Sequence, residues 1–524
     1  MTTVSHRSAR FRTTYPRLLA LGLGLGLVMR LILAAILPPG YDESYYLFYG
    51  RHPALSYFDH PLAVALWAAA GQHLGPLSRF YPVLALRLPS LVSYTGALLL
   101  LSEATRLWFG RRAALMACAL GSLAPLLFVC GGLLLLPDSP LLLVLSLLLW
   151  WLARHPLHAP RSPWQSLRFG WILGLLTLCK YQGLLLILTL VVLRLLATAR
   201  QRQLRWRDTA LIGAGWLMLS WPLWLWNGLH GWRSFTFQAG RTASVPGFHW
   251  EGPPLFLLSQ LALLFPTIGV LLLVALLWRS TPPQPPAAGF LRALALPQLV
   301  VFLLLAGRMQ VLASWLVPAW WLLLPLASAW LARPALWQQL WMRGLAAFTL
   351  VTVPLLTLVA AAHVRWGIAR ALIPAAVDTS GQLLAPSELR QALMAHPRVW
   401  QALRDAQVIG SNRYELPGFL ALALHGYSGA QYSCYTGDCR GFDDWRASLD
   451  PHARRGVLFA VVGDYMPLVT LQLPIREQPW RIQPLIPLGQ VPVRRAGQTV
   501  ALLEFFSFDP STAERVAFPP KPTR

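Results

Sequence analysis

The densest group of reactive side chains lies directly after the first long apolar run. It consists of two short motifs, Tyr41-Asp42-Glu43-Ser44-Tyr45-Tyr46 and Tyr57-Phe58-Asp59-His60-Pro61. Only 20 of the 524 residues are acidic, so three carboxylates and a histidine in this stretch stand out. A carboxylate at the end of a membrane helix can deprotonate an acceptor hydroxyl or bind a metal ion. The alternative is an aromatic belt with solvated acidic side chains.

Two further charged residues interrupt apolar sequence. Asp138 lies in Leu-Leu-Leu-Leu-Pro-Asp-Ser-Pro, where it can cap the following helix, open onto a cavity, or do both. Lys180 is one of only two lysines in the chain. A lysine within an apolar segment is costly and usually functional. It could hold a phosphate as a point charge, or its stem could simply extend to the membrane surface.

Other polar side chains at predicted helix ends are candidates for substrate binding. For each of them an ordinary interfacial or structural role is the alternative. They are Asp59, His60, Tyr181, Arg241, His249 and Arg308.

Carboxylates and cations at the ends of apolar helices suit a substrate with an apolar tail and an anionic head. A polyprenyl-phosphate sugar has this chemistry, because its tail can lie between helices while cations bind its phosphate. A carboxylate such as Asp42, expected at the height of lipid headgroups, would then activate the acceptor.

Composition places these residues in a membrane protein. The chain is 56% hydrophobic and 12% charged, whereas a soluble domain has about 25% charged residues. Its net charge of +24 does not indicate nucleic-acid binding, because the arginines fall mostly in short loops between apolar runs. That distribution follows the positive-inside rule.

The basic loops predict eleven membrane spans with a cytoplasmic N-terminus. The first span covers about 18–37, and residues 38–86 form a long outer loop. Basic clusters at both ends of 169–198 require two short helices that meet near Lys180. Residues 227–252 form a second outer loop, 254–278 a single span, and 279–289 an inner linker. The last two spans cover about 313–332 and 344–362.

The chain changes character after residue 362. The sequence predicts a transmembrane catalytic domain over 1–362 and a periplasmic α/β domain over 363–524. Strand-length apolar runs occur at 408–409, 457–462 and 500–506, with a helix over 386–394. Cys434 and Cys439 could form a local disulfide or remain reduced, and both options stay open. Residues 519–524 are expected to be disordered.

Several motifs together resemble glycosyltransferase family 39, which includes protein mannosyltransferases and the bacterial aminoarabinose transferases of lipid A. The resemblance extends over residues 18–330, where the motifs occur in the family's order. They are Asp42-Glu43, Tyr57-Phe58-Asp59-His60-Pro61, Pro137-Asp138, Cys179-Lys180-Tyr181, Trp226-Asn227-Gly228-Leu229-His230-Gly231-Trp232 with Phe235, Phe237 and Gln238, and Ser314-Trp315 with Pro318-Ala319.

The resemblance implies a GT-C fold and a lipid-phosphate sugar donor used on the periplasmic side of the bacterial inner membrane. It implies that Asp42 is the catalytic base with Glu43 beside it, and that Asp138 is a second acidic residue of the cavity. Lys180 and His60 would lie near the donor phosphate, although the aminoarabinose transferases have lysine where His60 stands. Some members bind a divalent metal ion and others do not, and the sequence leaves this open.

We therefore expect an integral-membrane glycosyltransferase that moves a sugar from a polyprenyl phosphate to a periplasmic acceptor. The acceptor could be lipid A, another glycolipid, a polysaccharide or a protein. The alternative from another class is a transporter or flippase of lipid-linked sugars. Transporters often show inverted repeats and midplane charges, and neither is evident here. A third possibility, a non-catalytic assembly protein, explains the charged residues less well.

Overall fold

A computed structural model describes residues 2–157, 159, 161–201, 206–243, 247–277, 286–373, 378, 380, 383–462, 480–482 and 484–515. Two compact units make up the chain. The first unit comprises residues 1–33, 54–67 and 87–357, and the second comprises 34–53, 68–86 and 358–524. The segments expected to disorder at 519–524, and most of the predicted inner linker at 279–289, lie outside the described residues. The domain boundary expected at 362/363 stays a prediction.

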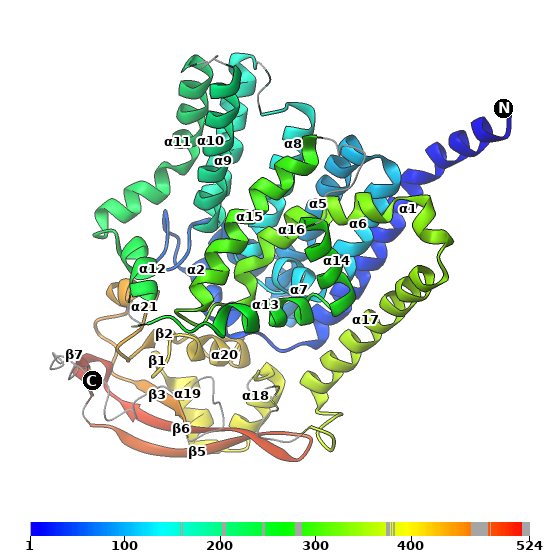
Figure 1. The fold of residues 1–524 in the computed structure, drawn as a ribbon. Coiled ribbons are helices and arrows are strands. Elements are labelled where there is room, and N and C mark those ends of the chain that lie inside the picture. Colours follow the sequence, from blue (N-terminus) through cyan, green and yellow to red (C-terminus); the bar gives the residue numbers. More distant parts are fainter. Residues whose placement is uncertain are drawn as a thin grey trace. The chain divides into compact units, whose positions relative to one another are not determined.

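Helices build the first unit, and Figure 1 shows their arrangement. They are α1 (Thr2–Ile36), α3 (Ala63–Gln72), α5 (Pro82–Phe109), α6 (Arg111–Leu123), α7 (Pro125–Gly132), α8 (Asp138–Arg154), α9 (Pro163–Cys179), α10 (Gln182–Gln201), α11 (Trp206–Leu229), α12 (Arg233–Ala243), α13 (Gly252–Leu263), α14 (Pro266–Leu277), α15 (Pro286–Ala306), η1 (Ala313–Leu316), α16 (Val317–Leu331), η2 (Pro334–Gln338) and α17 (Leu340–Trp366). Parts of α1, α3, α5 and α17 extend into the second unit.

The helices confirm a multi-pass membrane protein. Among the described residues, five helices are long and apolar enough to cross a membrane, and up to seven spans result if each bent pair counts as one. This measure uses length and composition alone, so the number eleven stays a prediction.

Two of the apolar stretches are bent. Over 254–278, which the sequence predicts as one span, α13 and α14 meet at 120° around Phe265, whose φ is +71°. Helices α6 and α7 likewise meet at 76°. A proline begins the second helix of each pair, Pro266 and Pro125. Proline lacks an N–H group and disfavours helical backbone in the residue before it.

The predicted break at Lys180 is confirmed. Helix α9 ends at Cys179, Lys180 has extended backbone, and α10 begins at Gln182. The turn is tight, because a methyl group at Gly183 would overlap the carbonyl oxygen of Leu176. Helix α9 also packs closely on α11, where a methyl group at Gly170 would overlap the backbone of α11. Such close helix packing through small residues is typical of membrane proteins (Figure 1).

Helix α16 lies at the centre of the first unit. Trp320 and Trp321 are fully buried, and each indole N–H donates a hydrogen bond to a polar side chain of another helix. Trp320 donates to Gln260 Oε1 of α13 at 3.0 Å, and Trp321 donates to Ser146 Oγ of α8 at 2.9 Å. These bonds satisfy the only polar atom of each large apolar ring.

The two long segments expected as outer loops contain helices. Residues 38–86 form α2 (Tyr41–Arg51), α3, α4 (Pro76–Phe80) and the start of α5, and residues 227–252 contain α12. Helices this short are unstable alone in water. Tertiary packing therefore decides that they form.

The second unit contains a mixed five-stranded sheet, in the order β2-β1-β3-β6-β5. Strand β1 pairs in parallel with β2 and β3, whereas β6 pairs antiparallel with β3 and β5. The predicted helix at 386–394 and the three predicted strands are confirmed. The unit contains β1 (Val408–Ser411), β2 (Gln431–Cys434), β3 (Gly456–Val461), β5 (Ile486–Arg495), β6 (Gln498–Phe508), a short pair of β4 (Trp480–Arg481) with β7 (Glu514–Arg515), and helices α18 (Pro386–Met394), α19 (Pro397–Asp405), α20 (Leu416–Ala423) and α21 (Gly441–Trp445).

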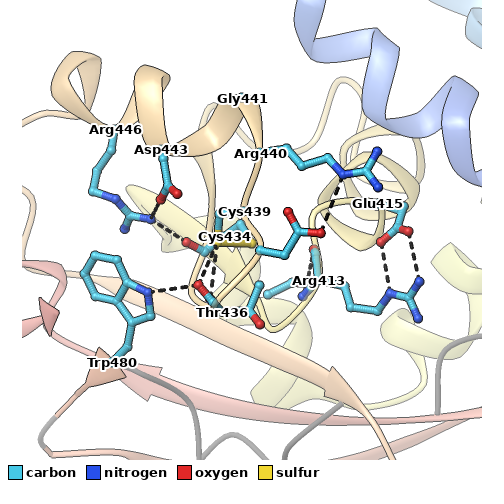
Figure 2. The surroundings of a disulfide bond; sticks show 12 residues. Arg413, Glu415, Cys434, Thr436, Cys439, Arg440, Gly441, Asp443, Arg446 and Trp480 are labelled. Carbon is cyan, nitrogen blue, oxygen red and sulfur yellow. Dashed lines mark hydrogen bonds and ion pairs between the residues drawn. A yellow bond between two sulfur atoms is a disulfide. The ribbon is translucent and has the colours of Figure 1, made fainter. Parts of the chain in front are cut away.

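The structure decides the question about the C-terminal cysteines. Cys434 and Cys439 form a disulfide between β2 and α21, shown in Figure 2. Arg446 donates a hydrogen bond to the carbonyl oxygen of Cys434 at 2.7 Å, and its guanidinium lies over the Trp480 ring at 4.0 Å. Trp480 Nε1 also donates to the carbonyl oxygen of Thr436 at 3.3 Å, so the bridged loop is tied to β4.

Candidate functional site

Asp138 and Lys180 form a buried ion pair in the helical unit. Asp138 is the first residue of α8, and Lys180 directly follows α9. Lys180 Nζ lies 2.9 Å from both Asp138 carboxylate oxygens. Lys180 is 5% exposed and Asp138 is 1% exposed. A lone charge at this depth would be strongly destabilising, so each residue depends on the other.

The residues after Lys180 connect this pair to α12 and to the start of α16. The Tyr181 ring packs edge-on against Phe235 of α12, with centroids 5.3 Å apart. Gln182 Nε2 donates to the carbonyl oxygen of Trp315 at 2.9 Å. The guanidinium of Arg241 lies over the Trp315 ring, 4.8 Å from its centroid. The structure therefore brings Lys180, Tyr181 and Arg241, which the sequence singled out separately, into one region.

The segment containing Asp59 and His60 is held by α12. Ser234 Oγ donates to the carbonyl oxygen of Tyr57 at 3.1 Å, and Gln238 Nε2 donates to that of Asp59 at 3.1 Å. The Asp59 side chain is nearly fully buried, and His60 is half-buried. Both predicted residues thus belong to the same helical unit as the ion pair.

Asn227 and Ser234 have a positioning role that the sequence did not assign. Both are fully buried, and the Ser234 N–H donates to Asn227 Oδ1 at 3.3 Å. Asn227 thereby fixes the start of α12, which in turn holds residues 57–59. The motif from Trp226 to Trp232 marked this region in the sequence, but nothing in the motif shows which distant segment it contacts.

Asp42 and Glu43 belong to the second unit, in the first turn of α2. The N–H of Gly40 donates to Glu43 Oε2 at 2.8 Å, and Glu43 is 1% exposed. Glu43 therefore caps the helix, a role that the resemblance did not assign to it. Asp42 is half-buried. Carboxylates in the first turn of a helix are favoured by the helix dipole.

The rest of α2 packs against the part of the second unit that contains the five-stranded sheet, which we call the C-terminal sheet domain. Ser44 Oγ donates to the carbonyl oxygen of Glu415 at 2.7 Å. The N–H of Gly441 donates to the Tyr45 hydroxyl at 2.9 Å. The Tyr45 ring also contacts the Tyr414 ring, which lies under the guanidinium of Arg440. Figure 2 shows that Arg440 and Gly441 directly follow the disulfide-bonded Cys439.

The two remaining candidates lie in exposed positions. Arg308 is exposed in the turn after α15. His249 and Glu251 lie 3.8 Å apart, and both side chains are mostly exposed. Their N–H and C=O groups order the neighbouring turn, since the N–H of His249 donates to the carbonyl oxygen of Gly307 at 2.7 Å. The structure gives neither side chain a contact with the Asp138–Lys180 pair.

The described residues do not fit a metal centre. Within the described ranges, no three histidine, cysteine, aspartate or glutamate side chains gather closely enough to hold a metal ion. Lys180 Nζ also occupies both oxygens of Asp138. No chemical step is therefore assigned to a metal.

Comparisons with known proteins support the same reading of the helical unit. Residues 59–226 match the family described as dolichyl-phosphate-mannose-protein mannosyltransferase. That range contains Asp59, His60, Asp138, Lys180 and Tyr181. No protein of curated function matches the chain.

Two solved structures have a similar fold. One is ArnT from Cupriavidus metallidurans bound to undecaprenyl phosphate, with a TM-score of 0.58 and 17% identity. The other is the apo state of the same protein, with a TM-score of 0.59 and 17% identity. Each likeness covers 93% of this chain and 97% of the other chain. The predicted resemblance to family 39 and the GT-C type of fold are thus confirmed.

Proposed function

We propose that this protein is an integral-membrane glycosyltransferase that takes a sugar from a polyprenyl-phosphate donor. The observation that carries the proposal is the buried Asp138–Lys180 pair at two helix ends. Its support is the family match, which spans this pair, and the fold shared with ArnT, whose structure has been solved with bound undecaprenyl phosphate.

The ion pair suits a phosphate-binding site. An ammonium group that is buried and held by one carboxylate can exchange part of that contact for a phosphate oxygen when the donor binds. Asp138 holds the lysine side chain in place in the meantime. Tyr181 and Arg241 would line the same region, and the cation of Arg241 over Trp315 would add to its positive charge.

The transfer would be a direct displacement at the anomeric carbon. The acceptor oxygen forms a bond to that carbon while the bond to the phosphate oxygen breaks. The acceptor proton passes to the Asp42 carboxylate, and polyprenyl phosphate leaves as an anion. We expect inversion at the anomeric carbon, and NMR of the product would show retention if the mechanism were wrong.

The C-terminal unit would serve catalysis by holding Asp42. Its residues Glu415 and Gly441 bond to α2 within three residues of Asp42. We propose that this unit lies on the periplasmic side of a bacterial inner membrane, where the acceptor is lipid A, another glycolipid, a polysaccharide or a protein. The arginine distribution supports this orientation.

The test is transfer in reconstituted vesicles. Radiolabelled polyprenyl-phosphate sugars and envelope extract are added to vesicles that contain the wild type, Asp42→Asn or the control Asp405→Asn. The control changes an exposed carboxylate of the same unit. We expect label to leave the carrier for another molecule with the wild type and the control. Asp42→Asn should lower the rate by at least about 100-fold while its unfolding temperature stays unchanged.

Two results would overturn parts of the proposal. Full transfer by Asp42→Asn would remove Asp42 from the role of base but keep the transferase. Label that crosses the bilayer on its carrier without transfer would identify a flippase instead.

A further inference from the structure

A cavity of about 350 Å³ opens between four helices of the first unit. Its walls come from the end of α5, the end of α14, the start of α15 and the end of α16. Leu271, Val274, Ala288 and Leu326 supply an apolar lining. The volume lies within the range of small-molecule sites, which starts at about 300 Å³.

The cavity is separated from the Asp138–Lys180 pair of the same unit by the length of a helix. Helix α16 begins beside Trp315, which contacts Gln182 and Arg241, and it ends at Leu331 beside the cavity. Its 15 residues span about 22 Å, most of the thickness of a bilayer's hydrocarbon core. The cavity therefore lies at the other end of α16 from the residues around the Asp138–Lys180 pair, and we infer that it faces the opposite membrane boundary. A donor bound at that pair does not explain it.

Cations and indole rings surround the cavity. Arg292 and Arg333 line it together with Trp108 and Trp330. Arg292 Nε donates to the carbonyl oxygen of Ala275 at 3.2 Å, which fixes the guanidinium at the wall. Arg333 is exposed and lies two residues after the end of α16.

The sequence around the cavity adds further positive charge. Arg111 and Arg112 begin α6, which is separated from the cavity-lining Phe109 by Gly110 alone. Nearby Glu103 is already paired with Arg106 at 2.8 Å. Tryptophan and arginine at this level are typical of the lipid headgroup region.

We propose that this cavity binds one anionic phospholipid. Its acyl chains would lie against the leucine and valine wall, and its phosphate would contact Arg292 and Arg333. Basic pockets between membrane helices bind the headgroups of anionic lipids in this way. The proposal concerns binding only and does not depend on the proposed transferase activity.

Native mass spectrometry of the purified full chain tests the proposal. The wild type, Arg292→Met/Arg333→Met and the control Arg168→Met are each incubated with phosphatidylglycerol, phosphatidylethanolamine, polyprenyl phosphate or inorganic phosphate. Arg168 is an exposed arginine at the start of α9, the end of that helix opposite Lys180, and it is not part of the cavity wall.

We expect the wild type and the control to retain one phosphatidylglycerol in preference to phosphatidylethanolamine. The double variant should bind it on the order of 30-fold more weakly, since each arginine near an anionic lipid contributes about 1 kcal/mol. Ala329→Leu, which fills the cavity and keeps both arginines, should also lose the lipid. This variant decides the matter if the double arginine variant does not fold.

Four results would overturn the proposal. The first is equal retention of phosphatidylglycerol by the wild type and both cavity variants, and the second is an equal loss of phosphatidylglycerol by Arg168→Met. The third is competition by inorganic phosphate at concentrations similar to that of the lipid. The fourth is a preference for polyprenyl phosphate over phosphatidylglycerol. The second would show a general surface-charge effect, the third a plain anion site, and the fourth a second site for the carrier.

Discussion

At the scale of single residues, the Asp138–Lys180 pair dominates the helical unit. Both residues are almost completely buried, and Lys180 Nζ contacts both carboxylate oxygens of Asp138 at 2.9 Å. Desolvating two charges costs more than most surface interactions return. A sequence that retains such a pair in an apolar unit has it either for conformational specificity or for binding.

Breaking the pair from one side should be much worse than removing it. We expect Lys180→Met to lower the free energy of unfolding by about 3–5 kcal/mol, because Asp138 is left buried and uncompensated. Asp138→Asn/Lys180→Met should recover most of that loss, yet stay inactive in sugar transfer. Thermal unfolding in detergent for both single variants and the double variant completes a double-mutant cycle.

The outcome separates two roles of the pair. Recovery of both stability and transfer in the double variant would show that the pair is structural alone. Equal losses in the single and double variants would contradict the ion-pair energetics.

At the scale of elements, α2 is the decisive one because it carries Asp42 and packs on the C-terminal sheet domain. Gly418 of α20 lies so close to α2 that a methyl group there would overlap the carbonyl oxygen of Ser44. Tyr41 and Phe419 add an edge-on ring contact at 5.5 Å. The position of α2 therefore depends on a backbone-to-backbone approach that tolerates no extra atom.

We expect Gly418→Ala to displace α2 and lower kcat for sugar transfer by roughly 100-fold, the cost of misplacing a reacting group by about 1 Å. The KM for the donor should stay unchanged, since the residues proposed to bind it are in the other unit. Gly429→Ala is the matched control, because a methyl group there meets no atom within 4 Å. Steady-state kinetics on both variants, with unfolding temperatures, provide the measurement.

Tyr45→Phe probes the same helix more gently. It leaves the buried Gly441 N–H without its acceptor, which costs about 1–3 kcal/mol. An unchanged kcat in both Gly418→Ala and Tyr45→Phe would show that the position of α2 does not matter for catalysis.

The end of α2 should make the stability of the second unit dependent on pH. His52 stacks on Trp445, with centroids 4.6 Å apart, and its Nδ1 lies 3.0 Å from the carbonyl oxygen of Phe48. Burial lowers the pKa of His52 below its usual value. Burial likewise lowers the pKa of His425 in the same unit.

Proton linkage determines whether the stability of the second unit rises or falls with pH. Below the unfolded-state pKa of about 6.5, the unfolded chain binds protons that the folded chain excludes, so stability falls as pH drops. We expect the unfolding temperature to decrease as the pH is lowered from 7.5 to 5.5. In His52→Phe, which keeps the ring contact, the decrease should be smaller, and differential scanning fluorimetry across this pH range would show it. An identical slope in the variant would contradict the assignment.

At the scale of the whole molecule, the two units are interleaved along the chain. Residues 34–53 and 68–86 precede most of the helical unit in sequence, yet they belong to the C-terminal unit. The buried aromatic side chains Tyr45, Phe48 and Tyr49 of α2 contact Tyr414, Phe442 and Trp445.

A chain ending at residue 362 should therefore not be an independent domain. It would expose the aromatic face of α2, and exposed apolar patches of this kind promote association. We expect such a chain to elute as aggregate in size-exclusion chromatography in detergent, and co-expression with residues 363–524 to restore a monodisperse complex. A monodisperse 1–362 fragment without its partner would show that the units fold separately.

The sequence by itself determined the membrane class, the interruption at Lys180 and the strands of the C-terminal sheet. Each of these has a local cause: apolar runs, a charge within such a run, and strand-length apolar segments. It also singled out Asp42, Asp138 and Lys180 as candidate site residues.

Only the tertiary structure decided which of these residues meet. Asp138 and Lys180 are 42 positions apart, and Ser44 and Glu415 are 371 positions apart. Periodicity reports which face of an element is apolar, but it carries no information about which distant element covers that face. The pairing of Asp138 with Lys180 and the packing of α2 on the C-terminal sheet domain both depend on complementary surfaces that form only when the chain folds.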